Sequence, residues 1–547
     1  MHLSSILLAG RFGAMTSYFS LSFCFVFLPI CILVYFFMPQ KARKYWLLFA
    51  SSLFFWFISG TLIVFLFMTV MSMHWFGLWL ERLKAESKSA VKALETDDKE
   101  VKKAVKKKYQ TRQRLVLAFA VVLHIGILAT LKYTPFFTTN INSLFELIGT
   151  SLRLAIPKYL IPIGISFFSL QALSYIIDVY RGTVKADGNI FRLALFISFF
   201  PQIVEGPICR YSQTADALWK VTQIKYDNFA LGVQRILYGM MKKLVIADRL
   251  NPAVTEIFNN YSQYDSGIIF LGAVFYTLQL YADFSGTMDA VMGIGQIFGV
   301  TMPENFRQPF FSRTISDFWQ RWHITLGTWF KDYIFYPVTM SKPMKKLTAS
   351  ARKKLGNHFG PLLAGAVALF CVWLANGLWH GSAWSYIFFG MYHFVLILMG
   401  SVISPAVKFI NGKLRLSPEN RIYKVLQILR SCVLVVIGEM FFRANGLRAG
   451  LAMFKRFFTN VGFTPLNNDL LASLGIDIHD IAIVCVTTVI VFIIGIMKEK
   501  GINVGEKIYS KNVVIRRTVI YALAMYIIIF GAYGPGYIPV DPMYAGF

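Results

Sequence analysis

A histidine that could act as a proton acceptor stands in residues 376–381, Asn-Gly-Leu-Trp-His-Gly. A neutral imidazole, with an ordinary pKa of about 6.5, can take a proton from a hydroxyl at physiological pH. The neighbouring glycines allow close approach by a substrate or a backbone. Asn376 lies one helical turn before His380, where its amide could orient the imidazole, stabilise an oxyanion or simply bond to another helix. By residue type alone, a structural histidine between helices is an equal alternative to catalysis.

A second histidine, His323, follows the run Asp-Phe-Trp-Gln-Arg-Trp at 317–322. On one continuous helix over 305–337, the large apolar residues would share a face with a polar stripe beside it. The segment is too polar to span lipid, so we expect it at the membrane interface or along a cavity, with Ser316 as its N-cap. An ordinary interfacial histidine is the alternative for His323. No local spacing joins it to His380, so the fold would have to bring them together.

Signatures of other catalytic chemistries are missing from the sequence. It has no His-Glu-x-x-His, no phosphate-binding Gly-x-x-x-x-Gly-Lys and no Gly-x-Ser-x-Gly. The six cysteines are scattered and form no Cys-x-x-Cys pair, so we expect neither a disulfide framework nor a metal site. Gly293, Gly295 and Gly299 stand in an apolar segment without a preceding strand, which favours close helix packing over a nucleotide loop.

The composition indicates a membrane protein. Of the 547 residues, 56% are hydrophobic and 15% are charged, whereas soluble domains have about 25% charged residues. Lipid-facing surface needs no charge. The net charge of +27 could suggest nucleic acid, but the basic residues gather in short runs between apolar segments, as at 106–108. Such runs normally face anionic lipid on the cytoplasmic side, so we expect contact with membrane lipid and no nucleic-acid partner.

Apolar segments recur along the whole chain. About 20 apolar residues cross a hydrocarbon core of roughly 30 Å, and no segment alternates like a barrel strand. We expect an all-α, polytopic membrane helical bundle over 1–547, a single domain with about eleven spans plus re-entrant and interfacial helices. Two of the candidate segments, 45–58 and 190–208, are the expected re-entrant or half-spans. The full set is 18–38, 45–58, 60–80, 115–133, 155–178, 190–208, 228–247, 265–298, 359–378, 383–403, 425–442, 481–498 and 515–533.

Two basic segments predict the orientation of the bundle. In residues 81–114 lysine and arginine outnumber the acidic residues, and residues 341–358 contain no acidic residue. Both are therefore expected to be cytoplasmic loops, and the first to contain a solvated helix because alanine, lysine and glutamate dominate it. The apolar run 18–38 is too long for a signal-peptide core, so we expect a retained first membrane helix.

Several short motifs follow one another in a specific order over most of the chain. They are residues 162–168, 175–181, 200–202, 206–208, 283–286, 303–306, 317–323, 378–381 and 533–537. In this combination the sequence resembles the membrane-bound O-acyltransferase (MBOAT) family, and most closely its bacterial branch that contains the membrane subunit of alginate O-acetylation.

The resemblance implies a helical bundle around a central tunnel, in a multi-pass protein of the bacterial cytoplasmic membrane. His380 matches the family's near-universal histidine and His323 its second important histidine, with Asn376, Trp379 and Asp317 as supporting residues. It also implies transfer of an acetyl group from a cytoplasmic thioester towards a hydroxyl of an extracellular or cell-wall polysaccharide. Acetyl-CoA is the expected donor, no bound cofactor is expected, and the expected partner is a separate extracytoplasmic esterase-like acetyltransferase.

Two other functions stay open at this point. A related enzyme would transfer D-alanine from a carrier protein to teichoic acid. A transporter for a polymer or an acylated lipid is the alternative of another class, although transporters often have internal repeats with matched broken helices. The two halves of this sequence show no convincing repeat.

Overall fold

The computed structural model describes residues 17–94, 97–417 and 419–533, which form an all-helical protein. Within these ranges the extended pairing is limited to one isolated antiparallel bridge, between Phe306 and Trp322. The described residues divide into two compact units, the first made of 17–232 with 291–303 and the second of 233–290 with 304–533. The predicted all-α fold is confirmed.

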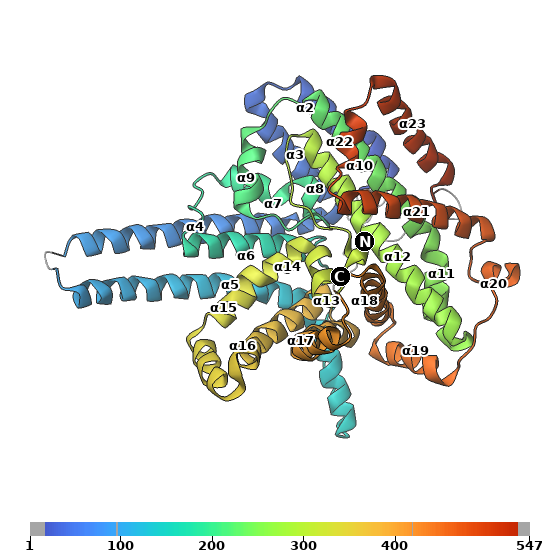
Figure 1. Cartoon of the computed structure of the whole chain (residues 1–547). Helices are drawn as coiled ribbons and strands as arrows, with labels where there is room; N and C mark the ends of the chain where they lie inside the picture. The colour runs from blue at the N-terminus through green and yellow to red at the C-terminus, as the bar shows by residue number, and fades with distance from the viewer. Residues whose placement is uncertain (1–16, 95–96, 418, 534–547) are drawn as a thin grey trace. The chain divides into compact units, whose positions relative to one another are not determined.

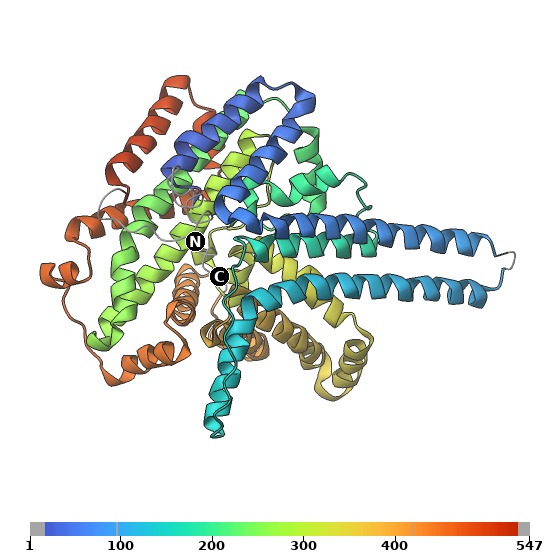
Figure 2. The ribbon, with the colours of Figure 1, turned by 180° about the vertical axis from the view of Figure 1, so that it is seen from behind.

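The first unit is built on three long helices, α3 (Gln40–Ser59), α4 (Ile63–Lys92) and α5 (Lys99–Leu147). Helices α4 and α5 pack side by side as an extended pair (Figures 1 and 2). Most of the basic segment 81–114 therefore consists of the adjoining ends of these two helices, where a loop with one solvated helix was expected. The shorter helices of the unit are α2 (Leu28–Phe37), α6 (Ile165–Arg181), α7 (Ile190–Ser198), α8 (Phe200–Ile203) and α9 (Tyr211–Lys220).

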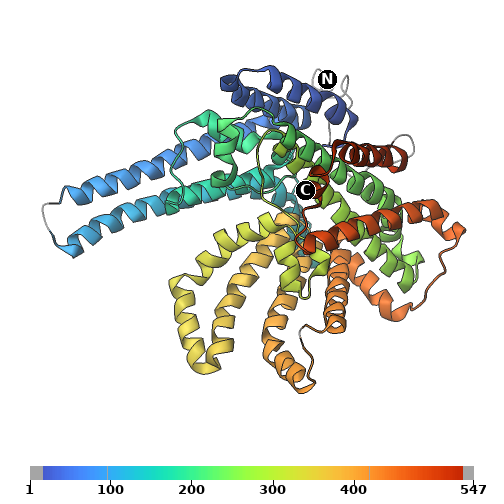
Figure 3. The same ribbon diagram turned by 45° about the horizontal axis from the view of Figure 1, so that its top comes forward.

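The second unit contains both candidate histidines. Its boundary is crossed by α10 (Tyr226–Met241) and α12 (Ser266–Ile297). Helix α16 packs along α17, and α17 along α18 (Figure 3). The helices wholly inside the unit are α11 (Asp248–Asn259), α13 (Ile315–Arg321), α14 (Ile324–Phe330), α15 (Tyr336–Thr339), α16 (Lys342–His380), α17 (Trp384–Lys413), α18 (Arg421–Arg443), α19 (Leu447–Thr459), α20 (Asn468–Ser473), α21 (Ile478–Glu499), α22 (Val504–Tyr509) and α23 (Val513–Phe530).

The segment 341–358 is helical, which corrects the expectation of a loop. Helix α16 begins at Lys342 with Ser341 as its N-cap, and the Ser341 hydroxyl accepts from the amide of Met344. Gly356 has φ 76° and kinks the helix before the apolar part begins. A long basic helix is compatible with the same charge pattern, because lysine and arginine are good helix formers.

The described residues contain eight helical stretches long and apolar enough to cross a membrane, fewer than the about eleven expected from sequence. The chain is a multi-pass membrane protein. The difference arises where the structure shortens an apolar run. Segment 18–38 yields a short apolar helix over Phe23–Phe37, segment 155–178 yields the 17-residue α6, and segment 228–247 contains the 16-residue α10. The eight stretches are Gln40–Lys92, Lys99–Leu147, Ser266–Ile297, Lys342–His380, Trp384–Lys413, Arg421–Arg443, Ile478–Glu499 and Val513–Phe530.

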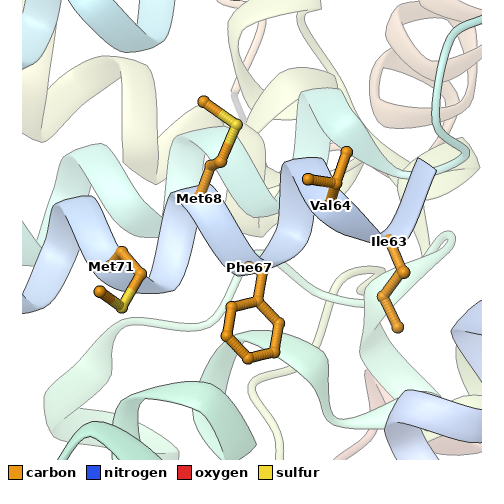
Figure 4. Close-up of a pocket in the computed structure, with 5 residues that line it drawn as sticks. All are labelled: Ile63, Val64, Phe67, Met68 and Met71. Atoms are coloured by element: carbon orange, nitrogen blue, oxygen red, sulfur yellow. The ribbon is translucent and has the colours of Figure 1, made fainter. Parts of the chain in front are cut away.

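The surface of α4 shows what a lipid environment permits. An apolar hollow there is lined by Ile63, Val64, Phe67, Met68 and Met71 (Figure 4). Val64, Phe67 and Met68 are each more than half exposed, although none of them has a polar group. In water such a surface would be unfavourable, whereas hydrocarbon tails cover it without cost.

Glycines in and beside α12 serve helix packing and helix termination. A Cβ on Gly232 of α10 would lie 2.6 Å from the carbonyl oxygen of Gly293, and one on Gly295 would lie 2.5 Å from Cε of Met302. Gly299 has φ 77° just after the helix ends. The prediction of close packing, in place of a nucleotide loop, is confirmed.

Candidate active site

His380 is the last residue of α16, and the helix ends there because a neighbouring helix passes directly beside it. A Cβ on Gly381 would lie 2.3 Å from the ring of Tyr386, and one on Gly377 would lie 2.6 Å from the carbonyl oxygen of Tyr386. A Cβ on Gly390 of α17 would similarly lie 2.4 Å from the carbonyl oxygen of Trp373. The glycines around His380 therefore permit close backbone approach, as their residue type predicts.

Aromatic rings surround the His380 imidazole, which is 6% exposed. The ring centroids of Trp379, Phe442 and Phe389 lie 5.0, 5.1 and 6.0 Å from its own, all in edge-to-face arrangements. They come from α16, α18 and α17, so three helices enclose the histidine. This wall keeps water from a reacting group and strengthens electrostatic interactions inside it.

His323 lies at a break in the chain, which corrects the prediction of one helix over 305–337. Helix α13 ends at Arg321, and α14 starts after His323, whose φ of 47° and ψ of 50° are left-handed. That conformation costs about 1–2 kcal/mol for an L-residue. Backbone hydrogen bonds hold it: in the Phe306–Trp322 bridge the Arg307 amide donates to the Arg321 carbonyl at 2.9 Å, and beside the bridge the Ile324 amide donates to the Asn305 carbonyl at 3.0 Å. Strained residues of this kind cluster at functional sites.

The His323 side chain is buried, 3% exposed. Its Nδ1 lies 3.2 Å from Oδ1 of Asn305, a residue that is itself fully buried. The same oxygen accepts from the amide and the hydroxyl of Thr325, at 3.1 and 2.9 Å. Burial lowers the pKa of His323 to about 3, since desolvation disfavours the charged imidazole. His323 is therefore neutral at physiological pH.

One indole ring joins the two histidines. The Trp379 ring lies 5.0 Å from the His380 ring and 5.7 Å from the His323 ring, centroid to centroid. Phe284 of α12 packs against His323, with 4.8 Å between the two ring centroids. The fold thus brings together two imidazoles that sequence spacing could not connect, with Trp379 between them. Two neighbouring imidazoles in an apolar enclosure can accept and return a proton during acyl transfer.

Asp317 contacts the side chain of Arg321 and the backbone of Arg313. Its carboxylate pairs with Arg321 at 2.9 Å and accepts from the Arg313 amide at 3.3 Å. Thr314 is the N-cap of α13 and accepts from the Asp317 amide, so the predicted cap Ser316 is wrong by two positions. The contacts described for Asp317 join it to neither histidine, and its supporting role remains a prediction.

Asn376 lies on the same helix as His380 and is buried, 7% exposed. Its Oδ1 has no hydrogen-bond partner within the described residues. This is compatible with a substrate contact, while the alternative bond to another helix has no support among the described contacts. The role of Asn376 at the site stays a prediction.

Asn305 was missed as a site residue at the sequence level, whereas His393 is among the few ionisable residues that the sequence places in an apolar segment. Asn305 belongs to a motif that carries the family resemblance, yet nothing in the sequence indicates that its side chain meets His323. His393 of α17 is fully buried, and neither ring nitrogen has a hydrogen-bond partner in the described ranges. Its ring lies 4.7 Å from Phe389, which also contacts His380. The signal for His393 was its burial cost in an apolar segment.

Carboxylates on α12 form ion pairs away from the histidines. Asp289 pairs with Lys242 at 2.7 Å and with Arg235 at 2.9 Å, and Asp283 pairs with Lys243 at 2.8 Å. Each carboxylate is thereby neutralised inside the protein, which indicates a structural role. Among the described residues, no group of three His, Cys, Asp or Glu side chains could hold a metal ion.

Sequence comparison agrees with the family resemblance. The sequence model described as MBOAT, membrane-bound O-acyltransferase family, matches residues 13–352. A probable alginate O-acetylase of Azotobacter vinelandii is 32% identical over 83% of this chain and 81% of its own length. A peptidoglycan O-acetyltransferase of Helicobacter pylori is 28% identical over 79% and 78%. A teichoic acid D-alanyltransferase of Bacillus subtilis is 30% identical over 51% and 68%. The family match contains Asp317 and His323 and ends before His380.

Proposed function

The chain belongs to the membrane-bound O-acyltransferase family, and from that premise we propose that it moves an acetyl group from a thioester to a hydroxyl for O-acetylation of an extracellular or cell-wall polysaccharide. The observation that carries the proposal is the meeting of His323 and His380 at Trp379. Two of its relatives are named as O-acetylating enzymes, one for alginate and one for peptidoglycan.

His380 acts as the general base in this proposal. Its imidazole takes the proton of the acceptor hydroxyl while the oxygen attacks the thioester carbonyl. The carbon–sulfur bond then breaks, and the imidazolium returns the proton to the departing thiolate, so that ester and thiol are the products. General-base catalysis of this kind contributes about 10²–10⁴-fold. The buried Asn376 and the ring of Trp379 hold the imidazole and the reacting carbonyl in place.

The donor and the partner follow from the same proposal. Acetyl-CoA reaches the site from the cytoplasm, where the basic residues of 81–114 and 341–358 attract its phosphates. The membrane in this proposal is the bacterial cytoplasmic membrane. A separate extracytoplasmic esterase-like acetyltransferase completes delivery to the polymer. The tunnel that connects the two sides remains an expectation of the family resemblance.

The test compares two buried histidines of similar exposure. In cells carrying His380→Ala, ester-bound acetyl on the extracellular polysaccharide should fall by at least about 10²-fold. His124→Ala is the matched control, because His124 is 4% exposed and lies in a membrane helix of the first unit. At equal amounts of membrane-inserted protein the control should keep its acetylation. Normal ester levels with His380→Ala would contradict the proposal.

Transfer of D-alanine to teichoic acid is the second candidate, because a named teichoic acid D-alanyltransferase is 30% identical over about half of the chain. Membranes containing the chain would be supplied with either acetyl-CoA or a D-alanyl carrier-protein thioester. Acetyl ester as the sole product supports acetylation, and D-alanyl ester supports the second candidate.

A further inference from the structure

The amide of Asn305 has a fixed orientation. Its Oδ1 lies 3.1 Å from the backbone nitrogen of Thr325. A backbone N–H can only donate, so the atom facing it must be the amide oxygen and not the amide nitrogen. The Thr325 hydroxyl, at 2.9 Å, donates to the same oxygen. This removes the usual ambiguity in assigning the two ends of an asparagine side chain.

The orientation of Asn305 decides which nitrogen of His323 carries the proton. Nδ1 lies 3.2 Å from Oδ1 of Asn305, and two atoms that both accept cannot form a hydrogen bond. Nδ1 is therefore the N–H donor, and Nε2 of the neutral ring has the lone pair. We propose that Asn305 is a positioning residue that fixes this tautomer, so that His323 accepts a hydrogen bond at Nε2 during acyl transfer.

This assignment rests on the proposed acyl transfer and narrows the role of His323 within it. An Nε2 lone pair can accept from an acceptor hydroxyl or from the N–H of another imidazole. It cannot donate to the oxyanion that forms at the thioester carbon. His323 is thus assigned to proton acceptance and not to oxyanion stabilisation, which must come from another donor.

Asn305 also fixes the position of the imidazole through the backbone. Its carbonyl accepts from the amide of Ile324 at 3.0 Å, directly after His323. The next residue, Phe306, pairs with Trp322, directly before His323. Asn305 and Phe306 therefore hold the residues before and after the left-handed His323, and Asn305 also holds the His323 side chain. The arrangement is that of a base oriented by a third group, which catalysis by paired residues requires.

The neutral state of His323 makes its tautomer relevant. Burial lowers the pKa of His323 to about 3. On α12, which packs against His323 through Phe284, Asp283 is paired with Lys243, and Asp289 is paired with Lys242 and Arg235. His380 of α16 contacts the same Trp379 ring as His323. On its own segment, Arg321 pairs with Asp317.

The test uses three variants of the full-length protein in membranes, with acetyl-CoA as donor. Asn305→Leu removes the acceptor oxygen, so the turnover rate should fall on the order of 10²-fold while KM for the donor stays within about twofold. Asn305→Asp keeps an oxygen at the same place and should retain the parent rate above about pH 8. Its carboxylate raises the pKa of His323 by about 1–3 units, so activity should be lost at higher pH than in the parent. Thr325→Val removes one donor to Oδ1 but keeps the backbone N–H, and should change the rate by less than about threefold.

The pH dependence of stability gives a second readout that needs no activity. In the parent, folded His323 stays neutral while the unfolded chain takes up a proton below about pH 6.5. The parent therefore loses stability from this group as the pH falls from about 6.5 towards 3. In Asn305→Asp, folded His323 binds the proton beside the carboxylate. The melting temperature of Asn305→Asp relative to the parent should consequently rise as the pH falls from about 8 to 5.

The outcomes separate this inference from the proposed function. Parent rates in Asn305→Leu, or an equal loss in Asn305→Asp and Asn305→Leu at every pH, would overturn the tautomer assignment. If the parent forms no acetyl ester, the proposed function fails. In that case the melting temperature of Asn305→Asp relative to the parent still tests the Asn305–His323 contact. If the difference between the two proteins is the same at pH 8 and pH 5, the contact is wrong.

Discussion

Each compact unit of the chain contains a buried histidine, and the surroundings of these histidines differ. In the first unit, His124 of α5 lies with Nε2 2.8 Å from the Ser72 hydroxyl of α4. That hydroxyl also donates to the Thr69 carbonyl at 2.8 Å, so the imidazole is the donor to Ser72. In the second unit, His323 and His380 come from different segments and both contact the ring of Trp379.

The difference shows that burial of a histidine at membrane depth is not sufficient evidence for a site. His124 forms a hydrogen bond within one helix pair. It lies beside a cavity of about 40 Å³ that is also lined by Ser169 and Phe168. Such a histidine links two helices. The histidines of the second unit are enclosed by several helices, and the rings of Phe284, Phe389 and Phe442 beside them carry no hydrogen-bonding group. Convergence of separate segments on one apolar enclosure distinguishes a candidate site from a structural bond.

Among the variants that test this contrast, the largest effect is expected from removing the ring that joins the two histidines. Trp379→Leu should lower the transfer rate about 10–100-fold, because a misplacement of roughly 1 Å at a reacting pair costs about that factor. Trp379→Phe keeps a ring and should retain more activity. Rates are compared at equal amounts of membrane-inserted protein.

The matched variant in the first unit is Phe168→Leu. Phe168 is buried and lines the cavity beside His124, so this change should lower stability without a comparable loss of rate. If Trp379→Leu keeps the parent rate, or if Phe168→Leu lowers it equally, the contrast between the two units is wrong.

The sequence was sufficient for the fold class, and it singled out the two histidines that the fold brings to one tryptophan, because ionisable residues in apolar segments are rare and the ordered motifs are specific. Their catalytic role stays a prediction. It was not sufficient for the break at His323. Neither Trp322 nor His323 is a glycine or a proline, and the left-handed backbone is held by contacts to the distant Asn305 and Phe306. Local sequence patterns do not contain such information, since tertiary contacts override helix propensity.

Element boundaries failed for a different reason. Thr314 and Ser316 are both good N-cap residues, and the choice between them depends on where the loop after Asn305 returns to the helix. The segment 341–358 was expected to be a loop because of its charge, yet a basic segment can be helical and still face lipid head groups. The sequence therefore indicated which residues could form the candidate site better than it indicated how the helices position them.

An intermediate effect is expected from the hydrogen bond in the first unit. Ser72→Ala removes the hydroxyl that faces His124 Nε2 and leaves a buried N–H without this acceptor. The loss should cost about 1–3 kcal/mol in the free energy of unfolding, seen as a lower melting temperature in detergent. The transfer rate per folded molecule should stay within about twofold of the parent rate. A large loss of rate with unchanged stability would instead assign His124 to the catalytic machinery.

The smallest effect is expected at Asp317, which tests how far the site extends from the two histidines. Asp317→Asn removes the charge that pairs with Arg321, but Arg321 keeps Glu499 as a partner at 2.9 Å. Both Asp317 and Arg321 are partly exposed, so the pair should contribute only about 0.3–0.5 kcal/mol. The Thr314 cap of α13 uses the Asp317 backbone and survives the change. We therefore expect almost unchanged melting and a transfer rate within about twofold of the parent. A loss of rate approaching that of Trp379→Leu would show that the position of α13 is transmitted to His323, and that the site includes the Asp317–Arg321 pair.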